Sequence, residues 1–204
     1  MQKRAPAYDK DGEQHYNLIS ALHKSIRGSD PDAALYWFSR MLNGGEDPLY
    51  IGRRLVRMAS EDIGLADPSA LSTTMAAVEA YRLLGSPEGE LALAQAVTHL
   101  AVAPKSIGVY VGYKSAMRTA KDTAKLGPPM AIRNAPTKLM KEQGYGEGYI
   151  YDPDTPDGFS GQNYFPDEMG ERPRFYSPVE KGREKAIKAH LATLADLRAR
   201  KNKP

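Results

Sequence analysis

The sequence contains no cysteine, which excludes disulfide scaffolds, thiolate zinc sites, iron–sulfur clusters and cysteine nucleophiles, and which fits a reducing compartment. It also lacks a long apolar run. The longest, residues 91–103, is too short to span a bilayer and contains Gln95, Thr98 and His99. The first six residues have no apolar stretch typical of a signal peptide. We therefore expect neither a membrane span nor secretion.

Most catalytic motifs are missing as well. No phosphate-binding P-loop is present, and the glycine-rich stretch 144–148 is expected to be a flexible turn, since no strand precedes it. The histidines show no metal-ligand spacing, and His15, on an apolar helix face, is expected to be a hydrogen-bonded residue at the edge of that face. A Ser-His-Asp triad assembled only in space would leave no trace in the sequence. We expect no catalytic, cofactor or metal site.

Charge is unevenly distributed along the 204 residues, although the net charge is only +3. Residues 1–101 carry −3, residues 102–141 carry +7, residues 142–171 carry −8, and residues 172–204 carry +7. This alternation indicates charge pairing within or between subunits, with a basic surface left over. The length suits one large domain or two small ones.

Apolar periodicity and capping residues predict a succession of short helices in the first two-thirds of the chain. Asp-Pro or Ser-Pro pairs at residues 30, 47, 67 and 86 place a capping oxygen before a proline, as at helix starts. The first helix is expected at 13–27 and the sixth at 104–126. The third helix is expected to end near Gly64. The fifth is apolar on nearly all sides, so we expect it at the centre of the fold.

Each helix has an expected buried face. The second offers Ala34, Trp37, Phe38 and Met41; the third Ile51, Leu55 and Met58; the fourth Leu71, Met75, Val78 and Tyr81; the sixth Val109, Tyr113, Ala116, Met117, Ala120 and Ala124. From 127 to 178 the chain is rich in Pro, Gly, Tyr and Asp, with one short helix at 135–143. Its aromatic content favours an arm lying on the helical body or on a neighbouring subunit. A last helix is expected at 179–200.

Two groups of charged residues are the candidate sites. Glu61 and Asp62 lie near a helix C-terminus, where a negative charge is unfavourable, so either Arg57 pairs with Glu61 while solvent screens Asp62, or both join a network that fixes packing between helices or subunits. Lys114, Arg118, Lys121 and Lys125 form a basic stripe that suits nucleic-acid phosphates; the alternatives are a solvated face or a contact with the acidic segment 142–171.

Several strings resemble one family. They are YDKDGE with HYNLISALHKSIRGSDPDAA at 8–34, ASEDIGLADP at 59–68, GSPEG at 85–89 and RNAPTKLMKE at 133–142. They are similar to the C-terminal region of the RarA/MgsA family of replication-associated recombination ATPases, which is related to the Werner-helicase-interacting ATPase. The resemblance covers about residues 8–190.

The resemblance implies a mainly α-helical bundle of about six to eight helices, like a clamp-loader collar, that assembles homotetramers. It implies a linker at 1–12 from ATPase and lid modules, a helical oligomerisation domain at 13–127, an extended arm at 128–178, and a C-terminal helix and basic tail at 179–204. Trp37, Phe38, Arg57, Glu61 and Asp62 are the candidate residues for the oligomer or ion-pair network.

The function implied is tetramerisation of a cytoplasmic, nucleoid-associated ATPase at stalled or gapped replication forks. Since no ATPase motif maps onto this chain, we expect a fragment without catalysis, with ATP and Mg²⁺ bound only by the missing module. Implied partners are other copies of the chain, DNA, and fork proteins such as single-stranded-DNA-binding protein. The alternative function is a DNA-binding module that uses the basic face of helix 104–126.

Overall fold

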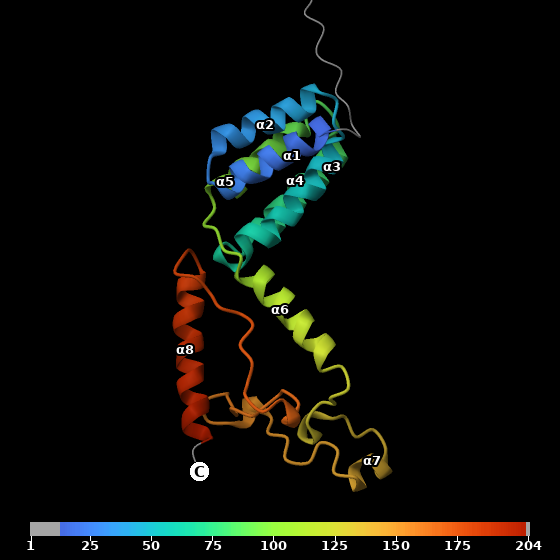
Figure 1. The fold of residues 1–204 in the computed structure, drawn as a ribbon, viewed down its shortest axis with the longest axis vertical. Helices are drawn as coiled ribbons and strands as arrows, with labels where there is room; N and C mark the ends of the chain where they lie inside the picture. The colour runs from blue at the N-terminus through green and yellow to red at the C-terminus, as the bar shows by residue number, and fades with distance from the viewer. Residues whose placement is uncertain (1–12, 203–204) are drawn as a thin grey trace, which may run out of the picture. The chain divides into compact units, whose positions relative to one another are not determined.

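The computed structural model describes residues 13–202, and helices are the regular elements among them (Figure 1). This confirms the predicted all-helical class. The α-helices are α1 (Glu13–Arg27), α2 (Pro31–Asn43), α3 (Pro48–Met58), α4 (Ser69–Leu84), α5 (Glu90–Val102), α6 (Gly108–Asp122), α7 (Lys138–Glu142) and α8 (Glu184–Lys201). Short turns η1 (Ala59–Ile63), η2 (Gly64–Ala66), η3 (Met130–Ile132), η4 (Asp152–Asp154) and η5 (Asp167–Met169) lie between them. The expected linker at 1–12 lies outside the described residues.

The chain divides into two compact units. The core unit contains the described residues up to 112 together with 176–185, and the arm unit contains 113–175 and 186–202. The division therefore passes through α6, whereas the sequence placed a boundary after residue 127. None of the helices in the described part of the chain is long and apolar enough to cross a membrane.

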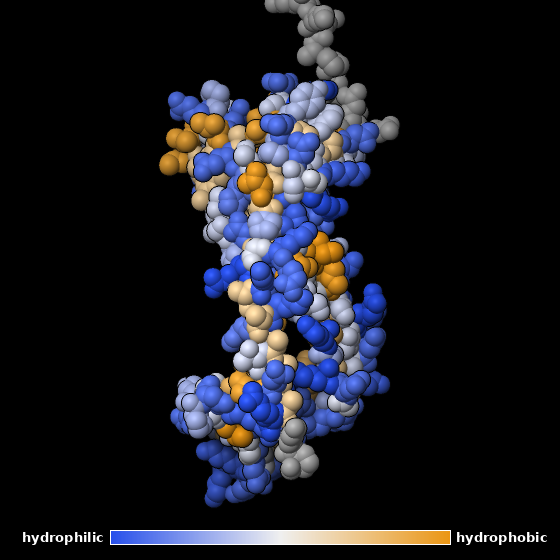
Figure 2. Space-filling model, turned by 90° about the vertical axis from the view of Figure 1, so that its left-hand side faces the viewer, coloured by the Kyte–Doolittle hydropathy of each residue, from blue (hydrophilic) through white to orange (hydrophobic). Residues whose placement is uncertain are grey.

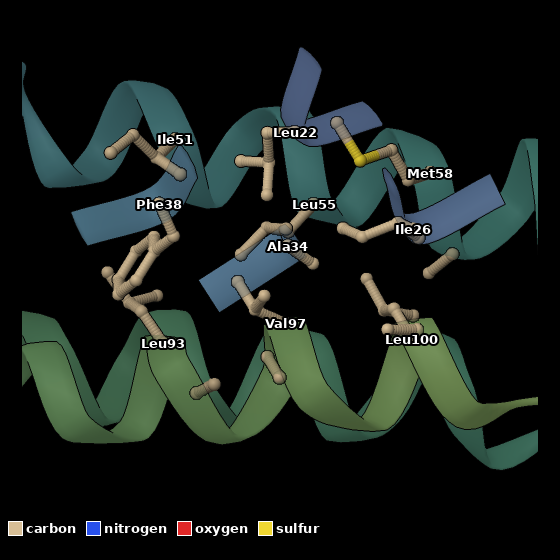
Figure 3. Packing of buried hydrophobic residues seen from close by; sticks show 14 of the residues in the cluster. Leu22, Ile26, Ala34, Phe38, Ile51, Leu55, Met58, Leu93, Val97 and Leu100 are labelled. Atoms are coloured by element: carbon tan, nitrogen blue, oxygen red, sulfur yellow. The ribbon is translucent and has the colours of Figure 1, made fainter. Parts of the chain in front are cut away.

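Helix α5 is the centre of the core unit, as its apolar sequence predicts. It packs against α1, α2, α3 and α4, and its buried residues are Leu93, Ala96, Val97, Leu100 and Ala101. Figure 3 shows Leu93, Val97 and Leu100 pointing toward side chains from α1, α2 and α3, with Phe38 and Ile51 among them. Burial of these side chains is the main stabilising contribution in the unit.

Helix α4 buries only part of the face expected: Val78 is buried and Tyr81 packs against the core, but the other two residues are exposed. Leu71 is 44% exposed and Met75 is 43% exposed, whereas the buried residues are Ala70, Thr74, Ala77 and Val78. The reason is close helix packing: on α3, a Cβ added to Gly52 would lie 2.9 Å from Val78 Cγ2. Small residues at the contact bring the helices together, and the larger side chains turn outward.

Two of the four predicted capping pairs begin a helix with proline as its first residue, and at a third pair α4 begins one residue after the proline. Asp30 Oδ1 accepts from Ala33 N at 2.9 Å, Asp47 Oδ1 from Leu49 N at 2.9 Å, and Asp67 Oδ1 from Ser69 N at 3.0 Å. The fourth pair does not, because the backbone turns at 85–89, where Gly89 N donates to Gly85 O, and α5 begins only at Glu90.

Helix α6 begins at Gly108 rather than at the predicted Pro104. The intervening backbone is held by contacts from outside the helix: Ser106 N donates to Asp62 O at 2.8 Å. Lys105 Nζ donates to the carbonyls of Ala101 and Ala103 at 2.8 and 2.6 Å, which satisfies acceptors at the end of α5. Its predicted apolar face is largely exposed, with Tyr113 at 64% and Met117 at 55%.

Residues 176–185 lead into α8 and include its first two residues, and this segment of the core unit is called the clasp here. Gly182 has φ +50°, and a Cβ there would lie 2.1 Å from Ala66 O, so only glycine fits this approach. Arg183 N donates to Ala66 O at 2.8 Å. These contacts explain why the last helix starts at Glu184 and not at the predicted residue 179.

Glu184 holds the clasp through hydrogen bonds to its buried carboxylate. Its side chain is fully buried and accepts hydrogen bonds from Ser106 Oγ at 2.8 Å, Val179 N at 2.7 Å and Tyr176 Oη at 3.1 Å. Burial and the adjacent carboxylate raise the pKa of Tyr176 to about 12. The local sequence does not distinguish Glu184 from an ordinary acidic residue of a first helical turn, so its role was not predicted.

The arm unit is held together chiefly by polar contacts. Asp152 accepts from Ser160 N at 2.7 Å and from Tyr164 Oη at 2.8 Å. Gln162 donates to Gly148 O at 2.7 Å and accepts from Ile150 N at 3.0 Å. The short helix α7 covers 138–142 of the predicted 135–143. Between 127 and 178 the remaining structure is turns and extended chain, as expected.

Candidate functional site: an ion-pair cluster and a basic helix face

A π-helical turn carries the two adjacent carboxylates. Helix α3 continues into η1, whose backbone brings Asp62 inward while Glu61 stays at the surface. The Asp62 side chain is 1% exposed and that of Glu61 is 17% exposed. π-helical turns are rare, and those that occur often lie at functional sites. No sequence pattern predicted this one.

Asp62 is held by two basic side chains of α1. Arg27 Nε donates to Asp62 Oδ1 at 2.6 Å, and His23 Nε2 lies 2.6 Å from Asp62 Oδ2. Burial alone would raise the pKa of Asp62, but the hydrogen bonds from His23 and Arg27 outweigh it and hold that pKa below its ordinary value. The same bond raises the pKa of Arg27. A buried carboxylate is thus kept ionised.

Glu61 bridges two arginines at the edge of this cluster. Arg57 Nε donates to Glu61 Oε2 at 2.8 Å, and Arg27 Nη2 lies 3.4 Å from Glu61 Oε1. The Arg57 guanidinium also lies over the Tyr110 ring, 5.6 Å from its centroid. Together with the Ser106–Asp62 backbone bond, these contacts join α1, η1 and the start of α6.

Within the chain, Glu61 and Asp62 lie in an ion-pair network with basic residues of α1 and α3. Arg57 does pair with Glu61 four residues on, but Asp62 is paired rather than screened by solvent. The ligand atoms of His23, Glu61 and Asp62 lie within 4.8 Å of one another, a spacing that a metal ion can use. Both carboxylates already bond to guanidinium groups, however, so we assign no metal there.

The basic stripe lies on the α6 side of the arm unit. Lys114, Arg118 and Lys121 are on α6, Lys125 follows it, and all four are exposed. In the described part of the chain, Arg118, Lys121 and Lys125 form no ion pair, and the structure shows no ion pair from them to the acidic segment 142–171. A solvated face and a nucleic-acid surface both remain compatible with this position.

The remaining candidates differ in accessibility. Phe38 is 3% exposed and belongs to the core, which makes it unavailable to a partner, whereas Trp37 is half-buried. His15 is buried rather than at an edge, with its Nδ1 2.5 Å from Glu46 Oε2. The sequence did not reveal Glu46 as its partner, because the two are 31 residues apart.

Comparison with known proteins decides the family. Residues 28–195 match the sequence model described as MgsA AAA+ ATPase C terminal, and residues 1–27 match one described as AAA C-terminal domain. The chain belongs to the MgsA AAA+ ATPase C-terminal family. This confirms the resemblance found in the sequence strings.

Several curated relatives agree with this assignment. The chain is 54% identical to Replication-associated recombination protein A of Coxiella burnetii over 90% of its own length and 42% of the relative's. It is 49% identical to the Haemophilus influenzae protein of that name, over 95% of this chain and 44% of that protein. It is 50% identical to ATPase WRNIP1 of Dictyostelium discoideum, over 74% of this chain and 17% of that protein. The chain thus spans less than half the length of these relatives.

The ion-pair cluster crosses the border between the two family matches. His23 and Arg27 fall in the match over residues 1–27, and Glu61 and Asp62 fall in the match over residues 28–195. Helix α1 is nevertheless part of the core unit, packing against α2 and α5. The domain division by sequence family therefore separates residues that the fold joins.

Proposed function

We propose that this region is the homotetramerisation domain of a replication-associated recombination ATPase. The observation that carries the proposal is the absence of an apolar core in the arm unit. All the buried hydrophobic residues of the described chain lie between Ile19 and Ala103, inside the core unit. A unit of this length without a core gains little from hydrophobic burial and is stabilised best by packing against a neighbour.

The arm unit also has the apolar side chains that such a contact needs. Its large hydrophobic residues that are at least one-third exposed are Tyr113, Met117, Met130, Leu139, Tyr149, Ile150, Tyr151 and Tyr164. Tyr113 and Met117 are four residues apart on α6, so they share one helix face. Figure 2 shows hydrophobic residues as orange patches among polar ones on its face of the molecule. Aromatic residues and methionine are enriched at protein interfaces.

The occupant we assign to this face is a second copy of the chain. Segments 102–141 and 142–171 carry opposite charges of similar size, +7 and −8, so the basic segment of one copy can pair with the acidic segment of another. Self-complementary patches are what a symmetric homo-oligomer requires. ATP, Mg²⁺ and catalysis belong, in this proposal, to the ATPase module of the full-length protein.

The test is light scattering over a dilution series. We expect a mass near four times 22.4 kDa for the unchanged chain and a smaller assembly for Tyr113→Glu/Met117→Glu. The matched control is Leu83→Glu, an 86% exposed leucine of the core unit, which should leave the mass unchanged. A monomer at all concentrations would reject the proposal, and loss of assembly in the control alone would place the interface on α4.

The alternative function is DNA binding through α6, favoured by the exposed stripe. Arg118→Gln/Lys121→Gln/Lys125→Gln should weaken binding of duplex DNA and reduce the salt slope by about 0.9 for each lost phosphate contact. Absence of salt-dependent binding by the unchanged chain would reject this alternative. Tetramer formation and DNA binding at nucleoid-associated forks are compatible, as is recruitment by single-stranded-DNA-binding protein.

A further inference from the structure

Two residues of the core unit, Asp62 and Ser106, join helix α1 to the clasp. The side chain of Asp62 bonds to His23 and Arg27 of α1, while its backbone oxygen accepts from Ser106 N at 2.8 Å. The hydroxyl of Ser106 in turn donates to Glu184 Oε2 at 2.8 Å. A continuous series of polar contacts therefore runs from α1 through these two residues to the clasp.

Both connecting residues are enclosed by their neighbours. Ser106 is 4% exposed, and the side chain of Asp62 is 1% exposed. The hydroxyl of Ser106 also accepts from Gly108 N at 3.1 Å, and a Cβ on Gly108 would lie 3.2 Å from Ser177 O of the clasp. In packing this close, a displacement of one residue has to be accommodated by the residues that it contacts.

The clasp is the part of this arrangement that can detach. The buried hydrophobic cluster of the core unit contains no residue of the clasp. The clasp is attached through hydrogen bonds instead, such as those accepted by Glu184 and the bond from Arg183 N to Ala66 O. Segments with few buried apolar contacts open locally at a lower free energy than the core does. The clasp thus has an attached and a detached state, and coupling between distant groups requires such a two-state element.

Withdrawal of α1 would make the present conformation of η1 unfavourable. A buried carboxylate without a partner costs more free energy than the loss of one neutral backbone hydrogen bond. Asp62 would therefore turn toward water. Because the same short turn carries its side chain and its carbonyl, the bond to Ser106 N would be lost in that movement, and the hydroxyl that binds Glu184 would no longer be fixed in place.

We propose that Asp62 and Ser106 couple the position of α1 to the attachment of the clasp. Withdrawal of α1 releases the clasp, and release of the clasp weakens the contacts of α1 with Asp62, because coupling between two sites is reciprocal. Helix α1 falls in the family match over residues 1–27 and the clasp in the match over residues 28–195, so the coupling joins the two matched regions. It depends neither on tetramer formation nor on DNA binding.

The test is hydrogen exchange of backbone amides in the full chain, followed by NMR. His23→Ala/Arg27→Gln should raise the exchange rate of the amides of residues 179–183 about tenfold or more relative to those of α5. The matched control is His15→Ala/Lys24→Gln. It removes one histidine and one positive charge from the same helix, and it breaks the other pair between α1 and a buried carboxylate. In the control, the exchange rate of the clasp relative to α5 should not change.

A triple variant tests whether the buried charge causes the release. Adding Asp62→Asn to His23→Ala/Arg27→Gln removes the unpaired carboxylate, and a neutral amide costs less free energy to leave buried. The clasp amides should therefore regain most of their protection. The proposal is overturned if the double variant and the control show the same clasp exchange, or if exchange is equally fast in the double and triple variants.

The reverse direction is measured in a variant that leaves α1 and Asp62 unchanged. Glu184→Ala removes the acceptor that holds the clasp, and the ring ¹⁵N signals of His23 should then shift, because His23 is linked to Glu184 through Asp62 and Ser106. The ring signals of His15 should stay in place. This measurement also decides the case in which the double variant fails to fold. Unshifted His23 signals alongside fast exchange in the clasp would contradict the coupling.

Discussion

The core unit and the arm unit are built on different physical principles. The core unit surrounds α5 with buried apolar side chains, so its stability comes from removing hydrocarbon from water. The arm unit instead satisfies its backbone through side-chain hydrogen bonds such as those of Asp152 and Gln162, which contribute less when they are open to solvent. The comparison shows that the described arm residues are held by polar contacts in place of a local apolar core.

The difference also separates their roles. In the core unit the buried carboxylate of Asp62 is paired with His23 and Arg27. The arm unit exposes aromatic and basic side chains, among them Tyr113 and Lys121. We infer that the first unit is the scaffold and the second provides the contacts.

The largest expected effect is that of deleting core volume. Leu100→Ala should lower the free energy of unfolding by about 3–4 kcal/mol, since Leu100 is fully buried on α5. The same deletion in the arm unit, Leu139→Ala, removes a side chain that is 63% exposed and should cost less than about 0.5 kcal/mol in a dilute, monomeric sample. Urea unfolding curves measure both. Equal losses would contradict the contrast between the units.

A second variant tests whether paired charge supports the scaffold. Asp62→Asn leaves Arg27 and His23 without their anion and should cost about 2 kcal/mol, less than for a fully buried pair because Arg27 is half-exposed. The folded-state pKa of Asp62 lies below the ordinary 3.8, so its stabilising contribution is present above pH 3.8 and is lost as the pH falls through the folded value. Acid unfolding should therefore be less steep in Asp62→Asn. Parallel acid curves for the two proteins would show that the cluster does not stabilise the fold.

Much of the core unit could be predicted from sequence because its signals are local. The apolar stripe of α1 repeats along a single helix, and the capping oxygens of Asp30 and Asp47 bond within one turn of their own helices. The structure contains α1 and both caps where they were predicted. The face of α4 was predicted only in part: Val78 and Tyr81 pack as expected, but hydrophobicity also favoured Leu71 and Met75, which are exposed. The packing is instead decided by Gly52 on another helix.

The candidate sites were predicted only in part, because their partners are far apart in the chain. The charge at Glu61 and Asp62 was noticeable in the sequence, and Arg57 is a local partner, but His23 and Arg27 come from 39 and 35 residues away. Likewise Glu184 meets Ser106 across 78 residues. A pattern of residue types carries no signal for such a pair unless the tertiary fold is known.

The clasp offers a third, more local perturbation. Glu184→Ala would leave Ser106 Oγ, Tyr176 Oη and Val179 N without their acceptor, which should cost about 1–2 kcal/mol. The cost is limited because residues 176–183 can detach and regain hydrogen bonds to water. Hydrogen exchange should increase at these residues while α5 stays protected. Uniform loss of protection through α5 would instead make the clasp part of the core.

The smallest expected effect is that of removing one side-chain hydrogen bond from the arm unit. Hydrogen bonds from Ser160 N and then from Tyr164 Oη lower the pKa of Asp152. Tyr164→Phe removes only the second, so an NMR titration should show the Asp152 pKa rising part of the way toward 3.8. The stabilising contribution of this carboxylate is present above pH 3.8 and is lost as the pH falls, and it should become smaller in the variant. At neutral pH the urea midpoint should not change beyond experimental error. A large drop in that midpoint would mean that the polar contacts of the arm unit unfold cooperatively. A single exposed hydrogen bond would then matter as much to the arm unit as a buried leucine does to the core unit.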